Sequence, residues 1–120
     1  LDCGGNIIIE QLETLTFIDV NSAKNMSSGS NSILKPNMEA AKEIARQLRL
    51  RNISGMIIID FINMKSEASK DTLIEALKRY IKDDNTVCTF VDITKLGLVE
   101  LTRKKVHKSL KQILEKPLDE

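Results

Sequence analysis

A chain of 120 residues is long enough for one domain with a modest hydrophobic core. Its 42% hydrophobic and 29% charged residues are typical of a globular protein, and its net charge of +1 excludes a strong overall attraction to nucleic acid. Any such affinity must come from local clusters of basic side chains. Aromatic residues make up only 3% of the chain, which argues against a stacking platform for single-stranded bases.

The two cysteines and the short apolar runs indicate the compartment. Cys3 and Cys88 lie far apart and fit no metal-binding spacing, so we expect two reduced thiols in a cytoplasmic protein. Apolar runs reach only about four residues, too short to span a membrane, and no signal peptide is visible. The chain begins without an initiating Met, so we expect it to be a piece of a longer protein.

The first predicted element is an antiparallel hairpin. Residues 6–10 and 15–20 are short β-branched runs separated by four residues of turn character. Residues 21–32 are rich in Asn, Ser and Gly and nearly free of large apolar groups. This composition predicts a mobile loop.

A helix and a central strand follow the loop. Pro36 or Asn37 is expected to open the helix, because Pro is favoured in the first turn and Asn as an N-cap. Apolar residues at helical spacing continue it to about Leu50. After a turn, the continuous apolar run at residues 56–61 predicts a central strand covered on both faces.

The next segments predict another helix and another strand. Residues 66–82 have an amphipathic pattern, with Ser66 or Ser69 as the N-cap. Residues 83–85 predict a turn, and residues 86–93 predict a strand.

The tail from Leu98 fits either a strand or a helix, and its apolar spacing favours a terminal helix from about Thr102. The whole order is then roughly ββαβαβα. Such an order predicts one α/β domain over residues 1–120, with a mixed β-sheet flanked by helices.

Two aspartates close apolar, strand-like runs. Asp19 follows residues 15–18, and Asp60 follows residues 56–59. A carboxylate is costly to bury without a partner, so each has either a fixed hydrogen bond, as a cap of the following turn or helix, or a functional role. Brought together at adjacent strand ends, the two would repel each other unless a cation lay between them, and hard oxygen ligands suit Mg²⁺ or Mn²⁺. Spacing alone leaves both interpretations open.

Five ordered blocks of sequence carry a resemblance to a known family. They are GGNIIIE (4–10), FIDVNSAK (17–24), NMEAAKEIARQLRLR (37–51), GMIIIDFINM (55–64) and LGLVELTRK (96–104). Together they closely resemble the ribonuclease E/G family, over nearly the whole chain. The match is to the metal-bearing part of the catalytic region, which is described as similar to deoxyribonuclease I.

The resemblance implies a metal-dependent endoribonuclease that acts on single-stranded RNA in RNA processing and turnover. Asp19 and Asp60 correspond to the family's two metal-binding carboxylates. They would hold one Mg²⁺, or Mn²⁺, that polarises the scissile phosphate and activates a water molecule, leaving a 5′-phosphate and a 3′-hydroxyl. Asn21 corresponds to a family asparagine and is expected to orient the metal or the phosphate, although an Asx turn that ends the strand is an equal alternative.

Two groups of basic residues are candidates for contacts with RNA. Arg46, Arg49 and Arg51 end the first predicted helix, where cations commonly complement the helix dipole. The second group, which we expect to track a phosphate backbone or to form a solvated face, includes Arg103, Lys104, Lys105 and Lys108. His107, the only histidine, is expected at the surface rather than in a catalytic role.

Three positions depart from the family pattern. Asn63 replaces a second acid that is common after the metal-binding aspartate, which lowers the local negative charge. Asn85 and Val87 replace two basic residues, one of which engages the RNA 5′ end in relatives. The resemblance therefore leaves a preference for 5′-monophosphorylated RNA open.

The resemblance also implies parts that this chain does not contain. Relatives have an RNA-binding module of the S1 type upstream and a zinc-binding cysteine pair downstream, and the full-length protein is expected to form a homo-oligomer. We therefore expect the isolated chain to be inactive. The alternative hypothesis is a non-catalytic structural or assembly module of an RNA-processing protein, in which the two aspartates only cap strand ends.

Overall fold

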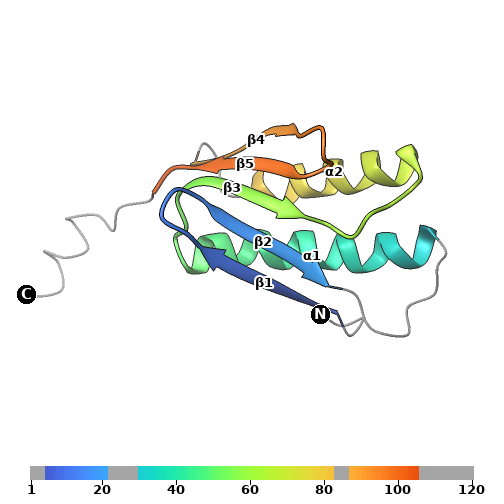
Figure 1. Cartoon of the computed structure of the whole chain (residues 1–120), viewed down its shortest axis with the longest axis horizontal. Helices are drawn as coiled ribbons and strands as arrows, with labels where there is room; N and C mark the ends of the chain where they lie inside the picture. Colours follow the sequence, from blue (N-terminus) through green and yellow to red (C-terminus); the bar gives the residue numbers. More distant parts are fainter. Residues whose placement is uncertain (1–4, 22–29, 83–86, 106–120) are drawn as a thin grey trace, which may run out of the picture.

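The computed structural model describes residues 5–21, 30–82 and 87–105. Within these residues the chain forms five strands and two helices (Figure 1). In chain order they are β1 (Asn6–Gln11), β2 (Thr16–Asn21), α1 (Ser30–Leu50), β3 (Gly55–Asp60), α2 (Glu67–Lys82), β4 (Cys88–Ile93) and β5 (Val99–Arg103).

The strands form one mixed sheet in the order β1-β2-β3-β5-β4. Only β2 and β3 run parallel, joined by a crossover that contains α1, and the other neighbouring strands are antiparallel. The expected α/β fold with a mixed sheet is confirmed, as is the antiparallel hairpin at the start of the chain.

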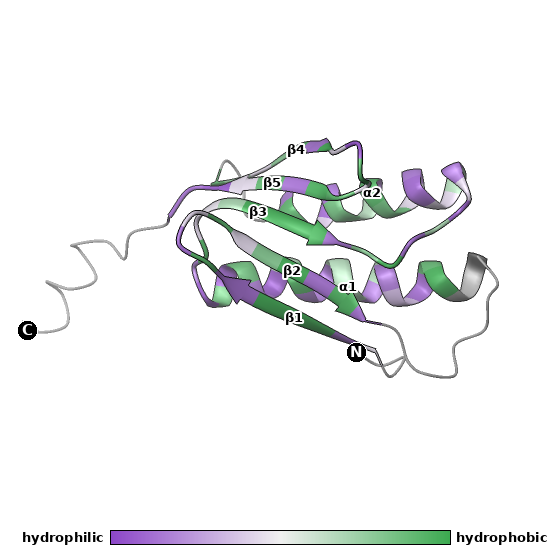
Figure 2. Ribbon diagram, in the orientation of Figure 1, coloured by the Kyte–Doolittle hydropathy of each residue, from purple (hydrophilic) through white to green (hydrophobic). Residues whose placement is uncertain are grey.

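Both helices pack side by side against one face of the sheet and leave the other face open (Figure 1). Alternate residues of the central strands point into this layer, because side chains alternate between the two faces of a strand. Ile18, Ile57, Ile59 and Leu101 are fully buried there against the apolar face of α1. Hydrophobic residues run along the central strands of the sheet, whereas β1 is an edge strand without a buried residue (Figure 2).

The expectation that β3 is covered on both faces is wrong for the part of the chain that the structure describes. Ile57 and Ile59 are buried beneath the helices, whereas Ile58 and Asp60 on the opposite face are only partly buried and Met56 is 42% exposed. The apolar run at this strand therefore supplies one core face and one open face.

The first helix begins earlier than expected. Residues 30–32 are helical rather than part of a loop, and Pro36 lies inside α1 with its side chain buried. Pro36 is the seventh residue of α1, beyond the first turn, so it removes one helical hydrogen bond and its ring crowds the carbonyl four residues earlier; burial of the ring offsets part of this cost. The rest of the expected loop, residues 22–29, lies outside the described residues.

The second helix matches its prediction closely. The hydroxyl oxygen of Ser66 accepts a hydrogen bond from the backbone N–H of Ser69 at 3.2 Å, so Ser66 is the N-cap of α2. The predicted strand near residues 86–93 is β4, which has a register shift between Phe90 and Asp92. The expected turn at residues 83–85 lies outside the described residues.

The C-terminal prediction needs a correction. Thr102 and Arg103 belong to β5 rather than to a helix, because Val99, Leu101 and Arg103 alternate as buried residues on one face of the sheet. Residues 106–120, where the rest of that helix was expected, are outside the described part of the chain. Neither described helix has the length and apolarity needed to cross a membrane.

Candidate functional site

Asp19 and Asp60 are direct neighbours across the parallel pair of β2 and β3. Each lies near the carboxyl end of its strand, and their side chains lie on the open face of the sheet, opposite the helices. Adjacent strands lie about 4.8 Å apart, so the two carboxyl groups share one small region. The structure thus brings together two residues that are 41 positions apart in the sequence.

The surroundings of Asp60 disfavour its charged form. Partial burial is the larger cause that raises the pKa of this carboxyl above its ordinary value, and the neighbouring charge of Asp19 is the second. A cation placed between the two carboxylates would remove both penalties. The site is therefore electrostatically suited to a positive ligand.

The donor set fits a hard divalent cation such as Mg²⁺. Two carboxylates side by side offer oxygen ligands, and Mg²⁺ commonly keeps several of its water molecules when it binds to one or two carboxylates. Among the described residues no group of three or more acidic, histidine or cysteine side chains gathers into a metal site. The role of Asp19 and Asp60 as metal ligands remains a prediction.

Asn21 extends β2 past Asp19 and shares the same face of the sheet. Its side-chain Nδ2 donates a hydrogen bond to Oδ1 of Asn6 on β1 at 3.1 Å. An Asx turn at Asn21 would involve the residues that follow it, which lie outside the described part of the chain, so that alternative stays open. The pairing with Asn6 fixes the direction of the Asn21 amide two residues beyond Asp19.

Sequence reasoning missed the residue that holds the backbone after Asp60. Asn37 of α1 is fully buried, its Nδ2 donates to the carbonyl oxygen of Ile62 at 2.8 Å, and its Oδ1 accepts from the Ile62 N–H at 3.0 Å. We expected Asn37 only as an N-cap. The available signal was its position four residues before Ala41 and seven before Ile44, which places a polar residue on the buried face of the helix.

A cavity of about 310 Å³ opens beside Asp60, at the same edge of the sheet. Its wall includes Asp60, residues 61–64, Lys70, Ile74, Ile93 and Leu96. It therefore lies between the start of α2 and the turn that joins β4 to β5. Nothing in the sequence pattern indicated this cavity.

The basic residues at the end of β5 lie away from the two aspartates. Arg103 pairs with Gly55 at the start of β3, five residues before Asp60, which is roughly 16 Å along the strand. Arg103 is buried and its Nη1 donates to Asn52 Oδ1 at 2.9 Å and to the Ile53 carbonyl at 3.1 Å. Because of this burial its expected contact with RNA is not supported.

Two other basic candidates remain open to solvent. Lys104 and Lys105 are exposed after the end of β5. Lys108 and His107 lie outside the described residues. A contact of Lys104, Lys105 or Lys108 with RNA stays a prediction.

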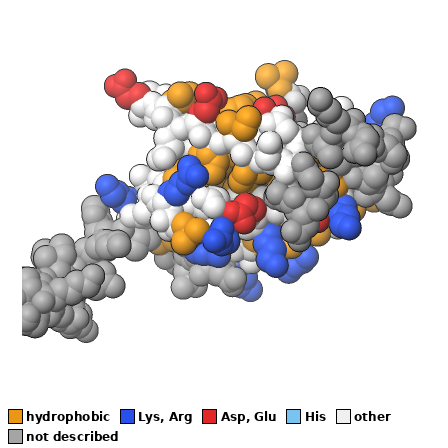
Figure 3. Space-filling view, turned by 90° about the horizontal axis from the view of Figure 1, so that it is seen from below, with side chains coloured by type: hydrophobic (Ala, Val, Ile, Leu, Met, Phe, Trp, Pro, Cys, Tyr) orange, Lys and Arg blue, Asp and Glu red, His pale blue; other side chains and the backbone are white. Residues whose placement is uncertain are grey.

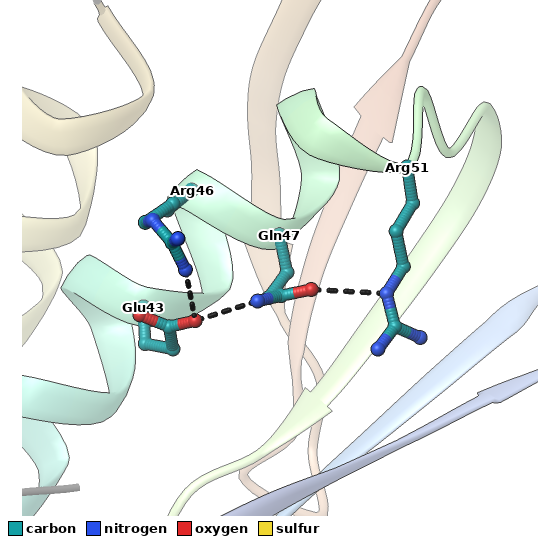
Figure 4. Close-up of polar contacts among 4 residues, drawn as sticks. All are labelled: Glu43, Arg46, Gln47 and Arg51. Carbon is teal, nitrogen blue, oxygen red and sulfur yellow. Dashed lines mark hydrogen bonds and ion pairs between the residues drawn. The ribbon is translucent and has the colours of Figure 1, made fainter.

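The arginines near the end of α1 take part in local contacts on the helix surface (Figure 4). Glu43 Oε2 accepts from Arg46 Nη1 at 2.9 Å and from Gln47 Nε2 at 2.6 Å, and Gln47 Oε1 accepts from Arg51 Nε at 2.9 Å. Lys and Arg side chains gather on the lower half of the space-filling view, whereas most acidic side chains lie above them (Figure 3). The exposed basic residues of α1 are Lys35, Lys42, Arg46 and Arg49, and they belong to the helix layer, whereas Asp19 and Asp60 lie on the uncovered face of the sheet.

Comparison with known proteins identifies the family. The sequence pattern of the Ribonuclease E/G family matches residues 1–106. The chain belongs to the Ribonuclease E/G family. It is 47% identical to Ribonuclease E of Synechocystis sp. over 122 aligned positions, which cover 100% of this chain and 18% of that protein.

Two further members of the Ribonuclease E/G family give a similar result. A chloroplastic Ribonuclease E/G-like protein of Arabidopsis thaliana is 39% identical over 98% of this chain and 12% of its own length. Ribonuclease G of Escherichia coli is 38% identical over 95% of this chain and 24% of its own length. The chain thus spans less than a quarter of the length of these relatives.

Proposed function

We propose that this chain is the metal-holding part of a ribonuclease E/G-type endoribonuclease that hydrolyses single-stranded RNA during RNA processing and turnover. Membership of the family supports the ribonuclease class. The single observation that carries the metal-dependent chemistry is the direct pairing of Asp19 with Asp60 on the open face of the sheet. A substrate as large as RNA needs such an accessible face.

Each residue has a definite task in this proposal. Asp19 and Asp60 hold one Mg²⁺, or Mn²⁺ in its place, and Asn21 orients a ligand or the phosphate from the same face. When bound, the ion supplies polarisation of the scissile phosphate and a water molecule of lowered pKa. A water oxygen bonds to phosphorus, the bond from phosphorus to the 3′ oxygen breaks, and that oxygen takes a proton. The products are a 5′-phosphate and a 3′-hydroxyl.

The remaining parts of the proposal concern the whole protein. We place it in the cytoplasm as a homo-oligomer, with an S1-type RNA-binding module before this chain and a zinc-binding cysteine pair after it. Zinc would be held only by residues outside this chain. The similarity to the metal-bearing, deoxyribonuclease-I-like part of the catalytic region is the basis for this domain assignment.

The test is the substitution Asp60→Asn in the full-length protein. Loss of one ligand charge is expected to lower kcat by about 100-fold or more while RNA affinity changes little, because the interaction with the ion matters most in the transition state. Asp19→Asn should behave in the same way. Glu13→Gln is the control, since Glu13 is an exposed carboxylate in the turn before β2, whereas Asp19 lies near the other end of that strand.

Two results would contradict the proposal. Near-normal turnover by Asp60→Asn would mean that this pair is not the catalytic centre. Failure of Mn²⁺ to bind the wild type more tightly than the Asp19→Asn variant would favour the alternative of a structural module, in which the aspartates only end their strands.

A further inference from the structure

The cavity beside Asp60 has three walls, and two of them are fixed by hydrogen bonds. The first wall is the loop that follows β3. The buried Asn37 side chain holds both the N–H and the carbonyl of Ile62 in this loop, at 3.0 Å and 2.8 Å. These two hydrogen bonds fix the loop to α1 at Ile62, two residues after Asp60. The first wall of the cavity is therefore formed before any ligand binds.

The second wall is the turn between β4 and β5. The Thr94 N–H donates to the Leu98 carbonyl at 2.8 Å, the Gly97 N–H to the Thr94 carbonyl at 2.9 Å, and the Leu98 N–H to Thr94 Oγ1 at 3.1 Å. Gly97 has a φ of +87°, which favours glycine. Leu96 lies in this turn and is 87% exposed, and Ile93 at the end of β4 is 41% exposed. Both line the cavity.

The third wall is the first half of α2. Ile74 presents an apolar surface to the cavity, and Lys70 brings a positive charge. Lys70 pairs with Glu67 at 3.1 Å, but its side chain is 43% exposed and such surface pairs are weak, so it can turn toward another anion. The cavity therefore combines apolar walls with one cation at its mouth and a carboxylate, Asp60, on its wall.

We propose that this cavity binds one nucleobase of the RNA, from a nucleotide adjacent to the phosphodiester held at Asp19 and Asp60, and that Lys70 faces a flanking phosphate. The inference rests on the proposed function, because it takes the scissile phosphate to lie at the aspartate pair. The cavity volume of about 310 Å³ is at the lower end of the range of roughly 300–1,000 Å³ for small-molecule sites, as suits a single ring system.

The chemistry of the lining matches a base attached to a charged backbone. Leu96, Ile93 and Ile74 offer apolar surface to the flat faces of a ring, and the exposed amide of Asn63 offers a donor and an acceptor to its polar edge. A purely apolar ligand would leave Lys70 without a role. Phe61, one of the few aromatic residues of the chain, also lines the cavity, so the low aromatic content is compatible with this site.

Binding to abasic oligonucleotides tests the proposal. The full-length protein carries Asp19→Asn to prevent cleavage, since Asp19 does not line the cavity. Single-stranded oligoribonucleotides that each lack one base are then compared with the intact strand. Removal of one particular base is expected to weaken binding about tenfold, and Leu96→Glu should weaken binding of the intact strand equally while abolishing that position effect.

Two matched controls separate the cavity from general effects. Leu50→Glu changes another leucine that is 65% exposed, at the end of α1, and is expected to leave the abasic profile unchanged. Lys70→Gln should reduce the salt dependence of RNA binding by about one unit of slope. Lys78→Gln on the same helix, with a similar exposure of 47%, should not.

The outcomes separate this inference from the proposed function. If cleavage by the wild type depends on Asp19 and Asp60, but no abasic position loses its effect in Leu96→Glu, the base-binding inference is wrong and the proposed function stands. If the position effect disappears in Leu96→Glu, yet cleavage survives Asp60→Asn, the cavity binds a base and the proposed chemistry is wrong. If Lys70→Gln and Lys78→Gln change the salt dependence of RNA binding equally, the proposed contact between Lys70 and a phosphate is wrong.

Discussion

At the level of single residues, the pairing of Asp60 with Asp19 makes the ionised site unfavourable in the absence of a cation. Burial and the adjacent charge both raise the pKa of Asp60 above its ordinary value of 3.8, so the folded protein retains this proton to a higher pH than the unfolded chain does. Stability contributed by this group is complete below pH 3.8 and is lost as the pH rises through the raised pKa. A site that costs stability when empty is expected where the charge serves binding.

This argument predicts that Asp60→Asn stabilises the protein at pH 7 when a chelator removes divalent ions. We expect an increase in the free energy of unfolding of less than about 1 kcal/mol, because the carboxyl is only partly buried and solvent screens its charge. Below pH 3.8 both proteins are uncharged at this position, so the difference should vanish. Denaturant unfolding from pH 3 to pH 7 measures it.

When Mg²⁺ replaces the chelator, the order of stability should reverse, with the wild type more stable than Asp60→Asn. A ligand that binds only the folded state stabilises it in proportion to the logarithm of its concentration, and the wild type has the additional ligand charge. A lower stability of Asp60→Asn in chelator at pH 7 would contradict the account of the raised pKa. Glu13→Gln, in the turn between β1 and β2, is the control.

At the level of elements, the end of β5 is joined to the turn after α1 by one buried guanidinium. Arg103 donates to the side chain of Asn52 and to the carbonyl of Ile53, and Asn52 has a positive φ of 49° at this turn. The contact links residues about 50 positions apart and closes the helix layer against the sheet. This is a structural role, and it distinguishes Arg103 from the two lysines that follow it.

Substitution of these neighbours should separate folding from RNA binding. Arg103→Met is expected to lower the free energy of unfolding by about 2–4 kcal/mol, because it leaves buried acceptors without their charged donor. Lys104→Met and Lys105→Met should change it by no more than about 0.5 kcal/mol, since both are exposed. Denaturant unfolding gives these values, and salt-dependent RNA binding by the full-length protein gives the complementary readout.

Two other results would assign different roles to Arg103 and to the two lysines. If Arg103→Met folds with wild-type stability but binds RNA more weakly, Arg103 contacts RNA rather than the turn. If Lys104→Met and Lys105→Met leave both stability and the salt dependence of RNA binding unchanged, the two lysines belong to a solvated face.

At the level of the whole molecule, the described part of the chain is a two-layer α/β arrangement in which the two helices cover one face of the sheet (Figure 1). The aspartate pair lies on the uncovered face. With a net charge of +1 and few aromatic residues, the chain has little general hold on single-stranded RNA. Under the proposed function, we therefore expect most of the positioning of the RNA to come from other parts of the protein.

We predict that residues 1–120 alone have little or no ribonuclease activity in Mg²⁺. Correct positioning of reacting groups can lower a barrier by several kcal/mol, and this chain represents only 12–24% of the length of the relatives compared above. The measurement is cleavage of a single-stranded oligoribonucleotide by the purified chain. Robust metal-dependent cleavage that Asp19→Ala abolishes would contradict the prediction and would mean that the chain holds RNA by itself.

The sequence by itself determined most of the elements and the family of the chain. Strand and helix periodicities depend on local spacing, so the first hairpin, α2 with its Ser66 cap, and β4 could be predicted from the order of residues. The acidic ends of two apolar runs identified Asp19 and Asp60 as candidates, because charge after a hydrophobic strand is costly without a purpose. The family blocks supplied the expected ribonuclease activity.

Only the tertiary structure decided which groups meet. The open face of β3 depends on where both helices pack, and the parallel register of β2 with β3 is what brings Asp19 beside Asp60. Arg103 looked like one member of a basic run, but its place in the sheet buries it. Helical spacing places Asn37 on the buried face of α1, but its partner Ile62 and the cavity beside Asp60 arise from contacts between residues far apart in the chain, which the spacing does not reveal.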